Sequence, residues 1–204
     1  MTASADLTGT TRRPWILGLF LIVTGGLGWW AAFALTLDKF AVLENPQADL
    51  DCNFSILVQC GTNLASAQGS AFGFPNPLIG LGGFAAVIAV GVSLLAGARF
   101  ARWFWIAFNV GIAGALAFVI WLVAQSIFVL TVLCPWCMLV WTVTIPLFWV
   151  VTGRNLAAGV YGARFVGLGR FIQSWVVPIV LVCYAVVALL AQVQLDVIGH
   201  IQHG

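Results

Sequence analysis

Five long stretches of the chain carry no charged side chain, and polar segments separate them. The uncharged stretches are Trp15–Leu37, Leu78–Ala98, Trp103–Ser126, Cys134–Thr152 and Trp175–Leu195. At a rise of ~1.5 Å per residue, about 20 helical residues cross a hydrocarbon layer ~30 Å thick. The pattern therefore predicts an all-α membrane protein with five transmembrane helices, and Pro146 is expected to kink the fourth.

The polar segments differ in length and content. Residues 1–13 end in two arginines and are expected to form a tail, and residues 153–174 are expected to form a glycine-rich loop. The arginines before an apolar run also resemble a signal peptide, but the run is longer than the usual ~7–15 residues. Residues 38–77 form a long predicted loop with two cysteines. Because ordered connections longer than about 12–15 residues are usually functional, this loop is a candidate for chemistry.

Composition narrows the class of protein. Of the 204 residues, 62% are hydrophobic and 7% are charged, whereas a soluble domain carries roughly 25% charged residues. So few charges exclude an ordinary soluble domain, a disordered chain and a nucleic-acid-binding protein. The composition favours a single helical bundle in a membrane.

The arginines set the expected orientation. All seven fall before the first span, between spans two and three, or between spans four and five. The opposite side holds Lys39 as its only basic residue, together with five of the six acidic residues. Cytoplasmic segments of membrane proteins carry an excess of arginine and lysine. We therefore expect a multi-pass protein of the inner (plasma) membrane with a cytoplasmic N-terminus. Residues 175–204 would supply the fifth helix and a short exoplasmic tail.

Four of the five cysteines fall on the predicted exoplasmic side, where disulfides persist. Cys52 and Cys60 lie in the long loop, and Cys134 and Cys137 form a C-x-x-C motif that opens the fourth span. The unpaired N–H groups and the dipole of a helix N-terminus favour a thiolate. Pro135 suits the first helical position, where no N–H is needed. The motif is suited to cycle between dithiol and disulfide, and the loop pair would connect Cys134 to an outside partner.

The residues alone leave other interpretations of the cysteines open. The C-x-x-C could be two buried small residues, both pairs could be structural disulfides, or the four cysteines could bind zinc. Zinc is disfavoured because a C-x7-C spacing is loose for a structural site, so no metal site is predicted. Cys183 stands alone in the fifth span and is expected to be a buried small hydrophobe. His200 and His203 resemble a metal pair only weakly.

The five uncharged stretches lack the groups that other membrane functions use. They contain no Asp, Glu, Lys, Arg or His, and ion-coupled transporters and proton relays normally place such residues inside the membrane. The spans also hold no histidine pair for haem, and the chain has no nucleotide-binding fingerprint. The thiols are the redox groups that the sequence offers, and a lipid-soluble quinone is the simplest electron acceptor for them.

This combination resembles the vitamin K epoxide reductase family over about residues 14–152. The matching features are the first span, the loop with its C-x7-C, and the C-x-x-C at the fourth span. Gly69–Gly73 and Asn76–Gly80 also resemble family segments. The resemblance implies a four-helix bundle around a quinone near the exoplasmic surface. The fifth span is absent from the animal enzymes and suggests a bacterial member.

The resemblance also implies a role for each cysteine. Cys137 faces the quinone, and Cys134 exchanges disulfides with Cys60. Cys52 and Cys60 receive electrons from a reductant. Many bacterial members continue after span five into a thioredoxin-like domain, and this sequence ends at Gly204. A separate exoplasmic thioredoxin-fold protein is therefore the expected partner.

Two further residues enter through the resemblance as contacts of the quinone cofactor, which would be of the menaquinone, ubiquinone or vitamin K type. Asn76 matches an asparagine that hydrogen-bonds a quinone carbonyl in family members. Trp141 stands where the animal enzymes have a tyrosine that hydrogen-bonds the other carbonyl. The second carbonyl contact would therefore differ from that of the animal enzymes.

Together these features predict a membrane thiol-disulfide oxidoreductase. Electrons would pass from a reduced thioredoxin-like protein through the loop pair and then the C-x-x-C pair to a quinone. The net result would be disulfide bonds in exported proteins. One alternative is an enzyme whose main role is the reduction of a quinone or of vitamin K epoxide. A second alternative is a non-enzymatic membrane protein with structural disulfides.

Overall fold

The computed structural model describes residues 14–45, 50, 52–53 and 57–195. The α-helices are α1 (Pro14–Glu44), α2 (Gly61–Ala65), α3 (Pro77–Leu95), α4 (Arg102–Ala124), α5 (Pro135–Ala157), α6 (Val166–Ser174) and α7 (Val176–Leu195). The short turns are η1 (Ala67–Ser70) and η3 (Ala163–Phe165), which are 3-10 helices, and η2 (Gln125–Leu130), which is a π-helix. No β-strand occurs among the described residues. The predicted tails 1–13 and 196–204, with His200 and His203, lie outside them.

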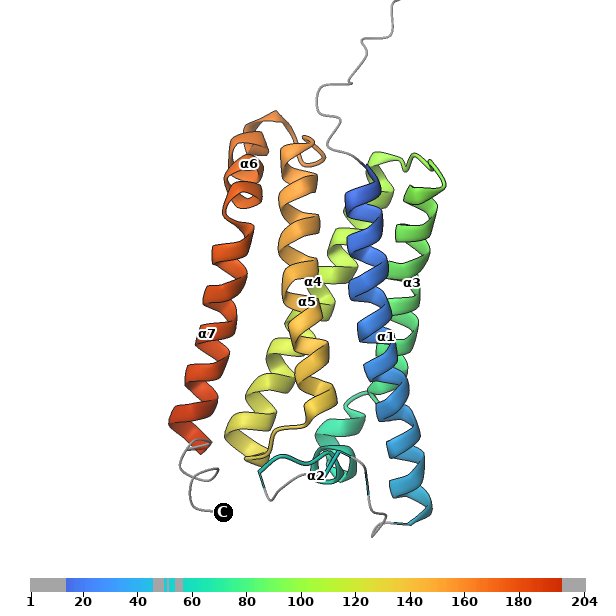
Figure 1. Ribbon diagram of the computed structural model, residues 1–204, viewed down its shortest axis with the longest axis vertical. Helices are drawn as coiled ribbons and strands as arrows, with labels where there is room; N and C mark the ends of the chain where they lie inside the picture. Colours follow the sequence, from blue (N-terminus) through green and yellow to red (C-terminus); the bar gives the residue numbers. More distant parts are fainter. Residues whose placement is uncertain (1–13, 46–49, 51, 54–56, 196–204) are drawn as a thin grey trace, which may run out of the picture.

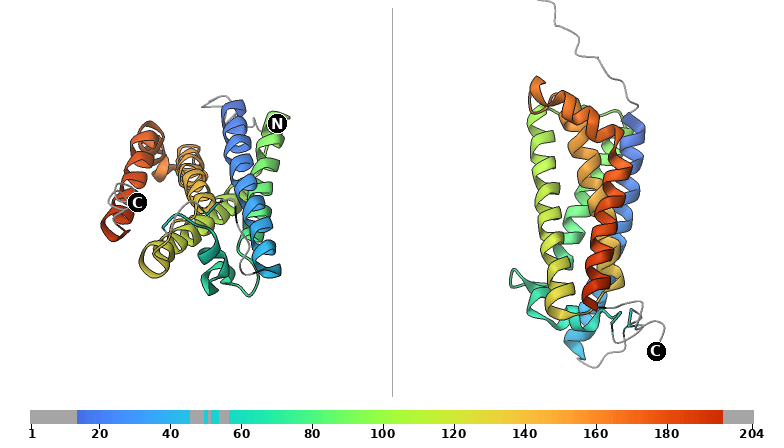
Figure 2. Two further views of the ribbon diagram at one scale, coloured as in Figure 1. Left: turned by 60° about the horizontal axis from the view of Figure 1, so that its bottom comes forward. Right: turned by 90° about the vertical axis from the view of Figure 1, so that its left-hand side faces the viewer.

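Five helices are long and apolar enough to cross a membrane, which confirms the predicted fold class. They are α1, α3, α4 with its extension η2, α5 and α7. In Figure 1, α1 and α3 lie side by side, α4 and α5 occupy the middle, and α7 lies on the far side of α5. The left view of Figure 2 likewise places α6 and α7 at one edge of the bundle and α1 and α3 at the other.

The two ends of the bundle differ in what they carry. One end holds α2 and the connection from η2 to α5, and we call it the cysteine end (bottom of Figure 1). The other end holds the start of α1, the α3–α4 turn and α6, and we call it the arginine end (top of Figure 1). The arginines among the described residues are Arg99, Arg102, Arg154, Arg164 and Arg170, and they belong to the α3–α4 connection and the α5–α6 region.

Glycines allow α1 and α3 to approach closely. A Cβ atom added to Gly91 would lie 2.8 Å from the carbonyl oxygen of Gly18, and one added to Gly25 would lie 2.8 Å from the Ile88 side chain. Small residues at such contacts let membrane helices pack backbone against backbone. Glycines at these positions therefore set the short distance between α1 and α3.

The first helix is longer than the uncharged stretch that predicted it. α1 continues to Glu44, so the loop that was predicted to start at residue 38 begins after the helix. Lys39 is buried, and its ammonium donates a hydrogen bond to the carbonyl oxygen of Leu64 in α2. This charge therefore has a partner in the segment that covers the cysteine end, in the part of α1 beyond the uncharged stretch. The helix is therefore longer than the uncharged stretch Trp15–Leu37, and its charged residues follow that stretch.

The predicted loop 153–174 is also largely helical. α5 runs past Pro146 to Ala157, and α6 packs against it so closely that a Cβ on Gly169 would lie 2.1 Å from the Ala157 nitrogen. Arg154 falls in the last turn of α5, where a positive charge interacts favourably with the helix dipole. Its guanidinium lies 3.8 Å from the ring centre of Trp105. This cation–π contact explains how the helix carries a charge that the sequence assigned to a loop.

Candidate redox centre

The structure brings the four predicted cysteines together at the cysteine end. Cys52 and Cys60 form a disulfide with a Cα–Cα distance of 5.8 Å. Cys134 and Cys137 are free thiols, and the Cys134 Sγ lies 3.2 Å from the Cys60 Sγ. Cys52, Cys60 and Cys134 are all buried. The loop pair and the helix pair therefore form a continuous series of sulfur atoms.

A short parallel bridge sets Cys60 beside Cys134. The backbone N–H of Leu133 donates to the carbonyl oxygen of Leu57 at 2.7 Å, and the N–H of Gln59 donates to the carbonyl oxygen of Leu133 at 2.9 Å. Cys134 follows directly after the bridged Leu133, and Cys60 follows directly after Gln59, whose N–H makes one of the two bonds. Two backbone hydrogen bonds thus fix the register in which the two sulfurs meet.

Side chains of α1 and of the loop hold the disulfide in place. The Asn53 Oδ1 accepts hydrogen bonds from the backbone N–H of Cys60 at 3.1 Å and of Gly61 at 3.4 Å. The Asp38 Oδ2 lies 3.4 Å from the Cys52 Sγ. The ligand atoms of Asp38, Cys52 and Cys60 lie within 4.8 Å of one another. The disulfide engages both of these sulfurs, so in this oxidation state they are not available as the thiolates that a zinc site would use.

Cys134 is the N-cap of α5, and its environment favours the thiolate. Its Sγ accepts a hydrogen bond from the Cys137 N–H at 3.5 Å. The hydrogen bond with the Cys137 side chain is the main reason that the pKa of Cys134 lies below its ordinary value, and the backbone N–H groups of Cys137 and Trp136 add to it. Burial and the negative charge of Asp38 act in the opposite direction. Cys134 is thus the thiol of this pair that is activated for exchange.

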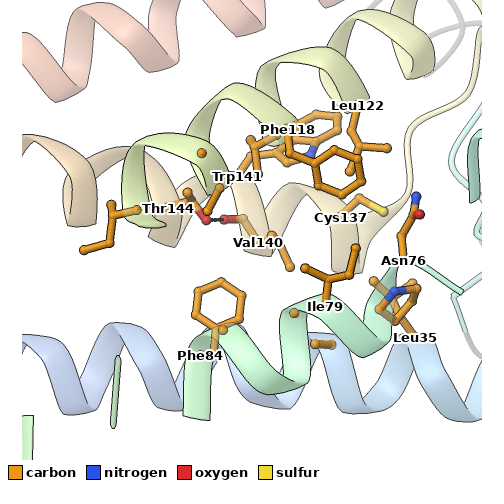
Figure 3. Close-up of a pocket in the computed structure, with 18 of the residues that line it drawn as sticks. Leu35, Asn76, Ile79, Phe84, Phe118, Leu122, Cys137, Val140, Trp141 and Thr144 are labelled. Atoms are coloured by element: carbon orange, nitrogen blue, oxygen red, sulfur yellow. Dashed lines mark hydrogen bonds between the residues drawn. The ribbon is translucent and has the colours of Figure 1, made fainter. Parts of the chain in front are cut away.

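Cys137 lies at the cysteine end of a large cavity between the α1–α3 pair and the α4–α5 pair. The cavity has a volume of about 590 Å³. Figure 3 shows the Cys137 sulfur near Asn76 at one end and Phe84 farther along. Most of the lining is apolar, and it includes Leu35, Ile79, Phe84, Phe118, Leu122 and Val140. A mostly apolar cavity of this size with a few polar groups is typical of sites for small organic ligands.

The family model for the vitamin K epoxide reductase family matches residues 19–152, which include all four cysteines. The chain belongs to the vitamin K epoxide reductase family. It is therefore a membrane oxidoreductase of this family, as the C-x7-C and C-x-x-C patterns indicated. No curated protein sequence matches the chain.

The two residues that the family resemblance assigned to the quinone both line the cavity. Asn76 uses both ends of its amide within the protein, because its Nδ2 donates to the Gln68 carbonyl oxygen at 2.6 Å and its Oδ1 accepts from the Ala71 N–H at 3.0 Å. Its amide therefore ties the start of α3 to η1 and to the turn that follows η1. Trp141 is buried in the lining.

The sequence interpretation missed a polar group of side chains at the cysteine end of the cavity. The Ser126 Oγ donates to the Asn63 Oδ1 at 3.2 Å, and the Gln68 Nε2 lies 3.5 Å from the Gln125 Oε1. Gln125 and Ser126 open the π-helical turn η2, a feature that often marks functional sites. The one available signal was that the predicted third span, Trp103–Ser126, ends in two polar residues.

Proposed function

We propose that this membrane oxidoreductase transfers electrons from a thioredoxin-fold protein to a quinone and so supports disulfide formation in exported proteins. The observation that carries the proposal is the 3.2 Å contact between the Cys60 and Cys134 sulfurs, with Cys137 facing the apolar cavity. A chain of sulfur atoms then leads from the loop to a site that suits a lipid-soluble acceptor. The arginine end would face the cytoplasm, and the cysteine end would face the exoplasmic side, where disulfides persist.

The loop pair would take electrons by thiol–disulfide exchange. A thiolate of the reduced partner attacks Cys52, which breaks the Cys52–Cys60 bond and leaves Cys60 as a thiolate. The second partner thiol then displaces Cys52, so the partner leaves with a disulfide and the loop pair becomes a dithiol. The first attack forms one mixed disulfide between the partner and Cys52, and the second resolves it, so that two electrons pass from the partner to the loop pair.

The helix pair would relay these electrons to the cavity. The Cys60 thiolate attacks Cys134 of an oxidised Cys134–Cys137 pair and releases Cys137. Cys52 then attacks Cys60 and releases Cys134, whose lowered pKa makes it a good leaving group. The Cys134–Cys137 dithiol finally gives two electrons and two protons to the quinone, which leaves as quinol while the two sulfurs rejoin.

The cavity suits a quinone of the menaquinone, ubiquinone or vitamin K type. Its lining is largely apolar, and Cys137 stands within it. Gly83 of α3 and Gly111 and Gly114 of α4 also line it, and a Cβ added to any of them would meet no atom within 4 Å. The open space beside α3 and α4 offers an isoprenoid tail a route towards the lipid.

The test is quinol formation by purified protein that is supplied with a reduced thioredoxin-fold protein and a quinone. We expect turnover in the wild type and its loss in Cys60→Ala and Cys134→Ala, while Cys183→Ala serves as the matched cysteine control. A wild-type protein whose Cys52–Cys60 disulfide resists mild reductants and which forms no quinol would contradict the proposal and favour structural disulfides. Assays with vitamin K epoxide and a dithiol reductant distinguish the family's epoxide reduction from thiol oxidation.

A further inference from the structure

We infer that Asn63, oriented by Ser126, forms a hydrogen-bond donor site for a carbonyl oxygen at the cysteine end of the cavity. The inference deepens the proposed function and rests on it, because a quinone is the carbonyl ligand which that function requires. It concerns α2 and η2, whereas the family resemblance pointed to Asn76 and Trp141.

Asn63 occupies a position between the thiols and the cavity. It lies in α2, one turn after Cys60, and it lines the cavity together with Cys137. Its neighbour Leu64 is buried against Cys60 and Cys134. A ligand held by Asn63 would therefore lie at the end of the cavity that contains the redox-active sulfur.

The oxygen of the Asn63 amide is hydrogen-bonded, and its nitrogen is not. Ser126, which is 3% exposed, donates its hydroxyl hydrogen to the Asn63 Oδ1 at 3.2 Å. The Nδ2 atom is buried and has no hydrogen-bond partner. Within the described part of the chain, the only other such side-chain atom is the Thr152 Oγ1. The Ser126 bond fixes the amide so that its donor side is the unpaired one.

A buried N–H donor without a partner is rare, because it loses its bonds to water and gains none in return. The mostly apolar lining of this cavity suits a ligand that brings an acceptor oxygen on an otherwise apolar body. A carbonyl oxygen on a ring meets this requirement. A cation would be repelled by the N–H group, and a free carboxylate would lose more hydration than one amide restores.

The hydrogen bonds of Asn76, the other asparagine in the lining, support Asn63 as the donor to the ligand. The Asn76 amide already donates to the Gln68 carbonyl oxygen and accepts from the Ala71 N–H. Asn76 thus shapes the wall of the cavity, while Asn63 keeps its donor unpaired. During reduction, an N–H group at the carbonyl oxygen would stabilise the negative charge that develops there.

The experiment compares wild type, Asn63→Leu, Ser126→Ala and Thr62→Ala in the full-length protein. Asn63→Leu removes the amide at similar side-chain size, and Thr62→Ala is the matched control, because Thr62 is the exposed neighbour in the same helix. We expect Asn63→Leu to raise the quinone KM about tenfold or more, as the loss of one buried hydrogen bond would. Ser126→Ala should raise it less, and Thr62→Ala should leave it unchanged. When Cys52→Ala and Cys137→Ala are added to each of the four, so that the Cys60–Cys134 mixed disulfide cannot be resolved, its accumulation should be the same in all of them.

A second readout measures the bound quinone without turnover. The carbonyl stretching band of an isotope-labelled quinone should move to higher frequency in Asn63→Leu, because the carbonyl loses its donor. An unchanged KM together with an unchanged band in this variant would overturn the inference. If Asn63→Leu does not fold, an unchanged band in Ser126→Ala would overturn it as well. A wild type that binds quinone but forms no quinol would overturn the proposed function, while the infrared comparison would still decide the role of Asn63.

Discussion

A protein that carries both Cys52→Ala and Cys137→Ala is expected to accumulate a Cys60–Cys134 disulfide. In the proposed relay this mixed bond is resolved from one side by Cys52 and from the other by Cys137, and the double variant lacks both. The two sulfurs lie 3.2 Å apart, and a disulfide bond is ~2.05 Å long. The sulfurs must therefore approach by only ~1.2 Å, which small rotations of two side chains supply without moving the backbone bridge.

The assay introduces a protease site into the α3–α4 connection, near Gly97, so that cleavage separates Cys60 from Cys134. After mild oxidation, the two fragments should migrate as one species on a denaturing gel until reductant is added. Adding Cys183→Ala should leave the result unchanged, whereas adding Cys134→Ala should abolish the link. Mass spectrometry that finds Cys60 and Cys134 both as free thiols in the oxidised double variant would refute the relay. The two pairs would then not exchange, despite their contact.

Four further outcomes are expected. The lowered pKa of Cys134 should keep its alkylation fast at pH values where ordinary thiols react slowly. Cys137→Ala should shift the pH dependence of this alkylation to higher pH, because the hydrogen bond that contributes most to stabilising the Cys134 thiolate is lost. Asn76→Ala should raise the quinone KM less than Asn63→Leu does, because the two hydrogen bonds of its amide go to Gln68 and Ala71 and shape the wall of the cavity, while mixed-disulfide trapping stays intact; a larger effect than that of Asn63→Leu would make Asn76 the direct contact. Cys183→Ala should retain quinol formation within a few fold, and a folded but inactive variant would reveal a missed redox residue. A reporter that is active only in the periplasm should give signal when fused after Gly204, and signal from cytoplasmic reporters alone would contradict the proposed orientation.

The sequence by itself determined the membrane architecture and the candidate redox groups. Uncharged runs of sufficient length become transmembrane helices because a helix satisfies its backbone hydrogen bonds within one segment, where lipid offers no partner. The C-x-x-C at a predicted helix start likewise implied an activated thiol, because the unpaired N–H groups of a helix N-terminus are a local property of the chain. The structure agrees with both, with Cys134 as the N-cap of α5.

Only the tertiary structure decided how distant segments meet. The 3.2 Å contact between Cys60 and Cys134 depends on a bridge between residues 57–59 and Leu133, and no local pattern encodes that register. Lys39, in the part of α1 that the uncharged stretch did not predict, donates to the Leu64 carbonyl oxygen, a partner 25 residues away in sequence. The unpaired donor of Asn63 became visible only when α2, η2 and the cavity were placed together. Patterns of charge and hydropathy can be read along the chain, whereas the hydrogen-bond partners of a buried polar group come from segments that are distant in sequence.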